Sequence, residues 1–204
     1  YYMVLLIADQ FTSNIVIHTF GYKIQDGSLS GELIRPIHPM LTNALINNIA
    51  FKALTIMGLT PIWIILFFLY KPDFSSISIT GILLAIPAML LAFFIGFLLS
   101  AAITSLAFWT TRVESIHEFY FALALLFSGQ FVPLTLMPQV IQNIAQYLPF
   151  QLLIYYPIEL ILGRLSTGQI VQGYVMAFIW LGISFLLFTW VWCAGVKRFS
   201  AVGA

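Results

Sequence analysis

Long uninterrupted apolar segments dominate this chain and limit what it can fold into. Residues 80–107 contain no charged side chain. At 1.5 Å per residue, a helix of that length exceeds the hydrocarbon thickness of a bilayer, about 30 Å. A transmembrane barrel would instead show segments of about ten residues in which apolar and polar residues alternate. With 61% hydrophobic and only 7% charged residues, the sequence predicts an all-α, polytopic helical membrane protein.

The apolar segments predict five membrane spans in a single transmembrane domain that covers residues 1–204. These spans lie at about residues 1–20, 43–70, 80–107, 119–137 and 170–194. Residues 138–163 combine several amides with an apolar stretch broken by Pro149 and Pro157. That region fits an outer re-entrant helical hairpin split near Pro149, and one irregular span is the alternative. Because the chain starts with apolar residues and no Met, we expect its natural start to lie earlier.

Basic residues near the ends of the predicted spans define the expected orientation. Lys197 and Arg198 follow the last span and place the C-terminus in the cytoplasm by the positive-inside rule. Counting the spans backwards, residues 24–39 also fall in the cytoplasm, whereas Lys71 and Arg164 fall outside. The sequence therefore predicts a multi-pass protein of a cell membrane with a cytoplasmic C-terminus.

Residues 24–39 form the most polar and turn-rich passage of the sequence. Asp26 or Ser28 is suited to cap a short helix, and Pro36 disfavours helix at the residue before it. A narrow apolar stripe with i, i+4, i+8 spacing and two charged neighbours would lie along this helix: Leu29, Leu33 and Ile37 beside Glu32 and Arg35. Such a stripe suits a groove on another protein, and a loop helix lying on the membrane surface also accounts for the spacing.

Polar side chains interrupt the first predicted span near its middle, at Asp9, Gln10 and Asn14. A carboxylate at that depth costs roughly 2.5–3.5 kcal/mol unless it faces protein or water. Two interpretations of Asp9 stay open: it lies on a pathway or helix interface, or the segment spans poorly and Asp9 lies near a helix end. Lys52 in the second span either snorkels to the surface or contacts a substrate.

The sequence contains no catalytic or metal-binding motif. Its three histidines are widely separated, and there is neither an H-E-x-x-H pair nor a Cys/His cluster, so we predict no metal site. A G-x-x-x-x-G-K-[ST] loop is also missing, so any use of ATP would be supplied by another chain. A net charge of +1 without a basic block argues against nucleic acid as a partner. The sequence thus predicts a membrane protein that is not itself an enzyme and binds no cofactor.

Several short motifs follow one another along the chain in a characteristic order. Residues 24–36 match the pattern I-x-x-G-x-L-x-x-x-L-x-R-P, and a Phe108-Trp109 pair ends the third span. The later pieces are Ser128-Gly129, Pro133-Leu134, Pro138, Leu148-Pro149-Phe150, Tyr156-Pro157 and Gly163. In this order, over essentially the whole chain, the motifs resemble the membrane permeases of ABC-2 type exporters, specifically a bacterial six-span branch. Because that branch has one further span at its start, the first span here corresponds to the second of six.

The resemblance implies an ATP-driven export permease of a bacterial inner membrane. Its partners would be two cytoplasmic ATP-binding subunits, which bind ATP and Mg, and a second permease copy or paralogue in the lipid bilayer. Residues 24–39 would then contain the coupling helix, with Gly27, Leu29, Glu32, Leu33, Arg35 and Pro36 as the ATPase-coupling residues. Candidates for the pathway or its outer gate are Asp9, Gln10, Asn14, Gln130, Pro133 and Pro138.

Two other functional classes remain as alternatives. An ion-coupled secondary transporter or channel would need intramembrane carboxylates along its route, and Asp9 is the one that qualifies. A non-transporting membrane scaffold would have the same composition. Copurification with an ATP-binding subunit distinguishes export from both alternatives.

Overall fold

The computed structural model describes residues 1–14, 16, 20–70, 77 and 79–199, and these residues form helices and turns without any strand. Three helices in the described part are long and apolar enough to cross a membrane. They are α4 (Ile46–Tyr70), α5 (Ile79–Ser105, extended by a 3-10 turn to Phe108) and α10 (Thr167–Val196). The prediction of an all-α helical membrane protein is therefore confirmed.

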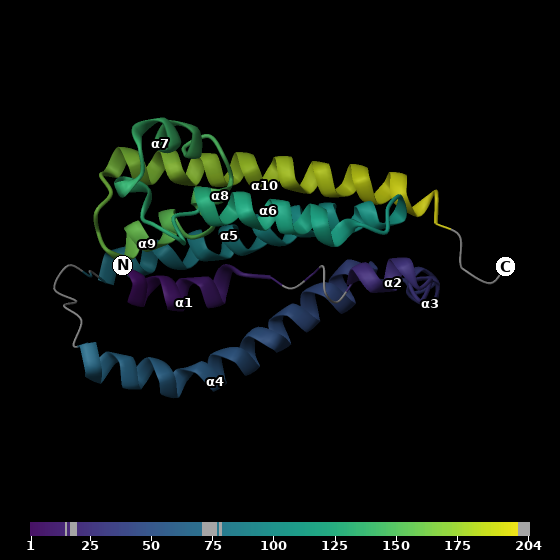
Figure 1. Cartoon of the computed structure of the whole chain (residues 1–204), viewed down its shortest axis with the longest axis horizontal. Helices are drawn as coiled ribbons and strands as arrows, with labels where there is room; N and C mark the ends of the chain where they lie inside the picture. The colour runs from purple at the N-terminus through teal and green to yellow at the C-terminus, as the bar shows by residue number, and fades with distance from the viewer. Residues whose placement is uncertain (15, 17–19, 71–76, 78, 200–204) are drawn as a thin grey trace.

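Helix α5 lies at the centre of the bundle (Figure 1). It packs along α10 and also contacts α1 (Tyr2–Thr12), α6 (Val113–Phe127), α8 (Phe150–Leu153) and α9 (Tyr155–Ile161). Its buried positions include Gly81, Ala85, Ala88, Ala92 and Gly96. Such small side chains let neighbouring helices approach closely without a large apolar driving force. Helix α5 is thus the part of the fold through which the other helices are held together.

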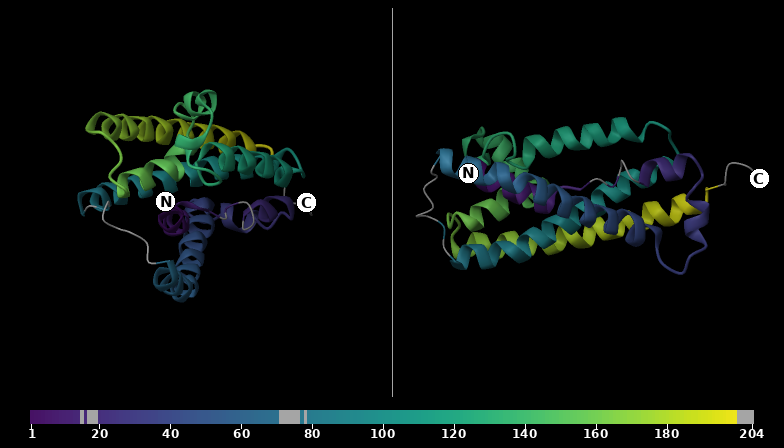
Figure 2. Two further views of the ribbon diagram at one scale, coloured as in Figure 1. Left: turned by 60° about the vertical axis from the view of Figure 1, so that its left-hand side comes forward. Right: turned by 90° about the horizontal axis from the view of Figure 1, so that it is seen from below.

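Helix α4 behaves differently, because it diverges from the other helices along its length (Figures 1 and 2). It follows a π-helical turn at Met40–Leu45. None of the 18 residues of its apolar stretch is buried within the chain. Pro61 lies inside the helix, where its missing N–H and its ring favour a bend. Helix α4 therefore exposes its apolar residues, including Leu54, Met57 and Phe68, to surroundings other than this chain.

The two ends of the bundle hold different segments (Figure 1). One end holds α2 (Tyr22–Gln25), α3 (Ser30–Leu33), the start of α6 and the C-terminal end of α10. The opposite end holds the N-terminus, α7 (Gln139–Ala145), α8 and α9. The segments assigned to one side of the membrane by the charge pattern thus share one end of the structure.

The first helix is shorter than the helix predicted over residues 1–20. Helix α1 ends at Thr12, and Ser13 has extended backbone angles (φ −61°, ψ 158°). Ser and Asn side chains compete with helical hydrogen bonds, which explains an end at this polar cluster. Asp9 consequently lies in the last turn of a helix, as the second interpretation of that residue expects. Residues 15 and 17–19 of the predicted span lie outside the described residues.

The helix predicted over residues 119–137 also has different bounds. Helix α6 begins at Val113 and ends at Phe127, and with 15 residues it is about 22 Å long. Gly129 then adopts a φ of 76°, which favours glycine, and Pro133 precedes a 3-10 turn at Leu134–Leu136. These chain-reversing residues end the helix well before residue 137, although the apolar composition continues.

Residues 138–163 form three short helices, α7, α8 and α9, rather than one irregular helix. Pro149 stands at the start of α8, close to the expected split. The Tyr155 N–H donates to the Ser128 carbonyl (3.0 Å), and the Tyr156 hydroxyl donates to the Ile170 carbonyl (2.7 Å). These bonds fix the region against α6 and α10. Its entry into the membrane from the outer side stays a prediction.

The contact between α9 and α10 depends on a glycine. A Cβ added at Gly173 would overlap the ring of Tyr156, whereas a Cβ at Gly182 of the same helix meets nothing within 4 Å. We expect Gly173→Ala to lower the free energy of unfolding by about 1–3 kcal/mol. Gly182→Ala should leave it unchanged or raise it by up to about 1 kcal/mol. Thermal unfolding of the detergent-solubilised chain measures both, and equal melting temperatures for the two variants would contradict this packing.

Candidate functional site

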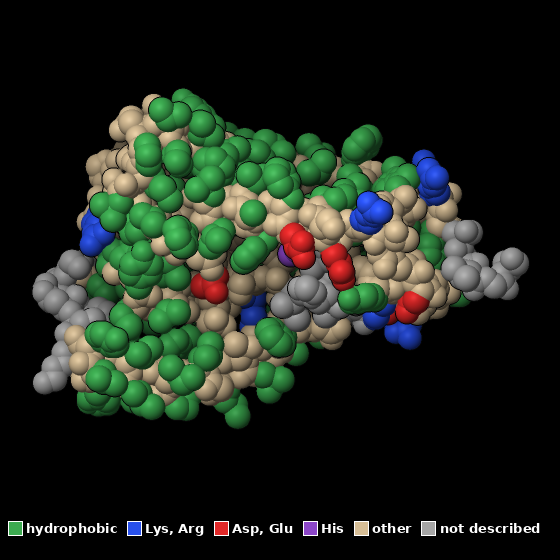
Figure 3. Space-filling model, viewed as in Figure 1, with side chains coloured by type: hydrophobic (Ala, Val, Ile, Leu, Met, Phe, Trp, Pro, Cys, Tyr) green, Lys and Arg blue, Asp and Glu red, His purple; other side chains and the backbone are tan. Residues whose placement is uncertain are grey.

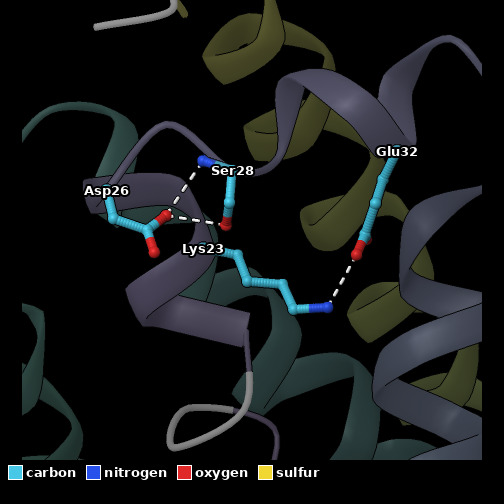
Figure 4. Close-up of polar contacts among 4 residues, drawn as sticks. All are labelled: Lys23, Asp26, Ser28 and Glu32. Carbon is cyan, nitrogen blue, oxygen red and sulfur yellow. Dashed lines mark hydrogen bonds and ion pairs between the residues drawn. The ribbon is translucent and has the colours of Figure 1, made fainter.

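The segment from α2 through α3 is built around a tight turn at Gly27, whose φ is 80°. The Asp26 carboxylate accepts hydrogen bonds from the Ser28 N–H (2.9 Å) and the Ser28 hydroxyl (2.7 Å) (Figure 4). The Ser30 hydroxyl donates to the Gly27 carbonyl (2.9 Å) as α3 begins. Both hydrogen bonds lower the pKa of Asp26, and the bond from the Ser28 N–H has the larger effect. The positive φ of Gly27 and the hydrogen bonds to the ionised Asp26 carboxylate both stabilise this turn. The turn therefore has a defined shape at neutral pH.

An ion pair joins the two short helices across this turn. Lys23 Nζ of α2 lies 2.6 Å from Glu32 Oε1 of α3 (Figure 4). The Glu32 side chain is only 14% exposed, and its Oε2 has no hydrogen-bond partner among the described residues. Fully exposed ion pairs contribute little to folding stability, but the carboxylate of this pair is mostly buried. The pair therefore fixes the position of α2 relative to α3.

Leu29 faces the interior of the chain, which corrects the surface stripe predicted from its spacing. Its side chain is 0% exposed and belongs to a core cluster with Phe97 of α5 and Trp192 of α10. Leu33 is partly buried against the same cluster. The cause is the turn at Gly27, which directs the residue two positions later towards the bundle. Leu29 is therefore not available as a surface contact for a partner, although Leu33 retains partial exposure.

The exposed part of the segment begins after α3, at residues 34–37. Ile34 is 86% exposed and Ile37 54% exposed, and both Arg35 and Pro36 between them are exposed. This exposed element, residues 34–37, combines two apolar side chains with one cation. It lies at the end of the bundle where charged side chains gather in the space-filling view (Figure 3).

The segment is also tied to α6 and to the turn before it. The Tyr22 hydroxyl donates to Glu114 Oε1 (2.8 Å), and Gln25 Nε2 donates to the Thr111 carbonyl (3.3 Å). Together with the packing of Leu29, these contacts attach the exposed element to α5, α6 and α10. The segment is therefore in direct contact with three helices of the bundle.

A second polar group lies where α1, α4 and residues 128–133 meet. Gln130 Nε2 donates to Asp9 Oδ1 (3.3 Å), and Lys52 Nζ of α4 donates to the Gln10 carbonyl (2.7 Å). Lys52 Nζ also lies 3.4 Å from Ser13 Oγ. Because the last carbonyls of a helix lack intrahelical donors, the ammonium caps the C-terminal end of α1. Lys52 thus points towards α1 rather than snorkelling to the surface.

Two amide side chains with buried polar atoms adjoin these helices. A Cβ at Gly96 of α5 would lie 3.4 Å from Asn14 Nδ2, so Asn14 packs against α5, and its Oδ1 is buried without a hydrogen-bond partner among the described residues. Asn48, one turn before Lys52 on α4, is 1% exposed, and neither polar atom of its side chain has a partner in the described part. Buried amides without partners are rare and mark positions where water or a ligand would be bound.

The comparison with protein families is clear-cut. The sequence profile described as "ABC-2 family transporter protein" matches residues 1–203. The chain belongs to this ABC-2 transporter family. It is accordingly a transmembrane permease subunit of an ABC transporter and a multi-pass membrane protein. Among curated proteins and solved structures, nothing matches the chain.

The structure of this ABC-2 permease brings some of the predicted pathway residues together and leaves others apart. Asp9, Gln10 and Gln130 lie in one polar group, whereas Pro133 and Pro138 stand at the starts of two short helices, the 3-10 turn and α7. Their role in an outer gate stays a prediction.

Asn48, which adjoins this polar group, and Lys52, which belongs to it, are not among the predicted pathway or gate residues. Their signal in the sequence is i, i+4 spacing near the start of a mostly apolar helix, which places both side chains on one face.

Proposed function

We propose that this ABC-2 permease exports its substrate from a bacterial cell across the inner membrane, driven by ATP hydrolysis in two cytoplasmic ATP-binding subunits. Those subunits would bind ATP and Mg, and a second permease copy or paralogue would complete the transporter. The observation that carries the proposal is the exposed element at residues 34–37, because it is both open to a partner and attached to the bundle.

The predicted coupling residues divide into two groups in this proposal. Gly27, Glu32 and Leu29 fix the segment through the turn, the ion pair and the core contact, with Leu33 partly buried beside them. Arg35 and Pro36, with their isoleucine neighbours, offer the surface on which an ATP-binding subunit would press. Closure of the two subunits on ATP would then move this surface and rock α5, α6 and α10.

The substrate pathway in this proposal runs between α1 and α4. An apolar cavity of about 320 Å³ lies between these helices, with Ile7, Trp63 and Phe67 among its lining residues. The polar group of Asp9, Gln10 and Gln130 joins α1 to the turn after α6. Asn14, a further candidate for the pathway, lies just after α1 in the sequence. Pro133 and Pro138 remain candidates for the outer gate. A substrate with an apolar body and a polar group suits these surroundings.

Copurification and flux together test the proposal. We expect gentle extraction to recover the permease with an ATP-binding subunit, and reconstituted vesicles to show substrate flux that requires ATP hydrolysis. Flux that follows an ion gradient without that subunit would instead favour a secondary transporter or channel. Association with other chains without any flux would favour a scaffold, and either result would overturn the proposal.

A further inference from the structure

A second cavity, of about 490 Å³, lies between the segment after α3 and the last turns of α10. Its volume falls within the range of small-molecule sites, about 300–1,000 Å³. Ile37 and Pro39 contribute apolar surface from one side, and Trp192 and Val196 from the other. The cavity is therefore an open, largely apolar groove between two elements that are distant in the sequence.

The charged side chains that line this cavity are all cationic. Arg35 contributes from the segment and Lys197 from the end of α10, and no Asp or Glu lines the cavity. Both side chains are exposed, and neither takes part in an ion pair among the described residues. Arg198 adds a further exposed cation next in sequence. Such unpaired basic groups favour an anionic ligand.

His38 adds a neutral donor to the same cavity. Its Nδ1 accepts a hydrogen bond from the Met40 N–H (3.2 Å), and its ring centroid lies 4.8 Å from that of Trp192. Burial lowers the pKa of His38, which favours the neutral form of its imidazole. With Nδ1 acting as the acceptor, the proton is on Nε2, which is free to donate to an anionic oxygen.

The length of α10 is sufficient for its C-terminal end, and with it the cavity, to reach the level of lipid headgroups. The helix has 30 residues and is about 45 Å long, compared with about 30 Å for the hydrocarbon core. Trp192 lies in its last turns and Lys197 directly after it. Trp and Lys side chains favour the interface between hydrocarbon and water. The bilayer is thus the nearest source of an anionic group with an apolar body.

We propose that this cavity binds an anionic phospholipid, with Arg35 and Lys197 at its phosphate. Trp192 and Val196 would contact the glycerol and the upper part of an acyl chain. Charge complementarity and the mixed lining favour this ligand over a soluble anion, which would leave the apolar walls uncovered. A bound lipid would lie between α10 and the exposed element at residues 34–37, so Arg35 would belong both to this site and to the proposed coupling surface.

Fluorescence quenching of Trp192 tests the site directly. In a variant that keeps Trp192 and has Phe at its other four tryptophans, Trp63, Trp109, Trp180 and Trp190, brominated phosphatidylglycerol and brominated phosphatidylcholine are compared at equal mole fraction in vesicles. Because bromine quenches at short range, we expect phosphatidylglycerol to quench about twofold more strongly if the cavity selects an anionic headgroup.

Substitutions at Arg35 and Lys197 distinguish a lipid-binding site from a general attraction of anionic lipid to the basic end of the bundle. Arg35→Gln with Lys197→Gln should abolish the preference for phosphatidylglycerol, and Lys197→Arg should retain it. Arg112→Gln removes a charge directly before α6 and outside the lining of the cavity, and it should leave the preference intact. Equal quenching by the two lipids, or a preference that persists in the double Gln variant, would overturn the proposal. Neither measurement needs an ATP-binding subunit, so the result is independent of the proposed coupling.

Discussion

Replacing Ile34 and Ile37 by Asp is expected to lower the substrate-stimulated ATPase activity of the assembled transporter by tenfold or more. Each isoleucine, if buried by a partner, contributes about 1.5–3 kcal/mol, and an aspartate at the interface would remove that contribution and add a desolvation cost. A loss of about 1.4 kcal/mol already weakens binding tenfold. Both side chains are more than half exposed in the isolated chain, so the permease itself should fold and insert normally.

The matched control for this variant is Leu136→Asp. Leu136 is 74% exposed and belongs to the 3-10 turn near the opposite end of the bundle. The Leu136→Asp substitution should therefore leave the amount of copurifying ATP-binding subunit unchanged, whereas the variant with Asp at residues 34 and 37 should reduce that amount. If the variant with Asp at residues 34 and 37 retains both the subunit and its stimulated activity, the exposed element is not the coupling surface.

Leu29→Ala is expected to lower the free energy of unfolding by about 2–5 kcal/mol. The Leu29 side chain is fully buried among Phe20, Ile24, Met40 and Trp192, so truncation leaves a cavity in the core. Coupling should fail in this variant because the segment loses its attachment to α5 and α10. Thermal unfolding of the purified chain provides the measurement.

Ile34→Ala serves as the comparison for the core substitution. With an 86% exposed side chain, Ile34 contributes little to the stability of the isolated permease, so its truncation should change the melting temperature only slightly. An equally small change for Leu29→Ala would show that Leu29 is not part of the core. The two variants thus distinguish the side chain that anchors the segment from one that faces outwards.

The candidate site could be predicted from the sequence only in part. The polarity and turn residues of the passage around Gly27 predict that it lies outside the bilayer, and the order of the motifs predicts the family, which the family comparison confirms. Spacing alone puts Leu29 and Leu33 on a shared stripe, but it does not say whether that stripe faces a partner or the chain's own core. The hydrogen bond from Gln130 to Asp9 spans 121 positions, and no local pattern indicates it.

The bounds of the helices could also be predicted from the sequence only in part. Apolar composition predicts that residues 1–20 and 119–137 span the bilayer, since hydropathy is insensitive to where a helix begins. The structure ends α1 at Thr12, where Lys52 of another helix caps a carbonyl, and begins α6 at Val113. The end of α1 involves a hydrogen bond from a residue 42 positions away in the chain, whereas the bounds of α6 follow from local turns that hydropathy does not register.

The sequence by itself determined that the protein is an all-α helical membrane protein with several long apolar segments and one markedly polar passage at residues 24–39. These properties follow from transfer of side chains into lipid, which is a sum over residues. Only the tertiary structure decided that Leu29 faces inwards and residues 34–37 face outwards. That choice depends on the turn at Gly27 and on Trp192, which lies far away in the chain and supplies the core against which Leu29 packs.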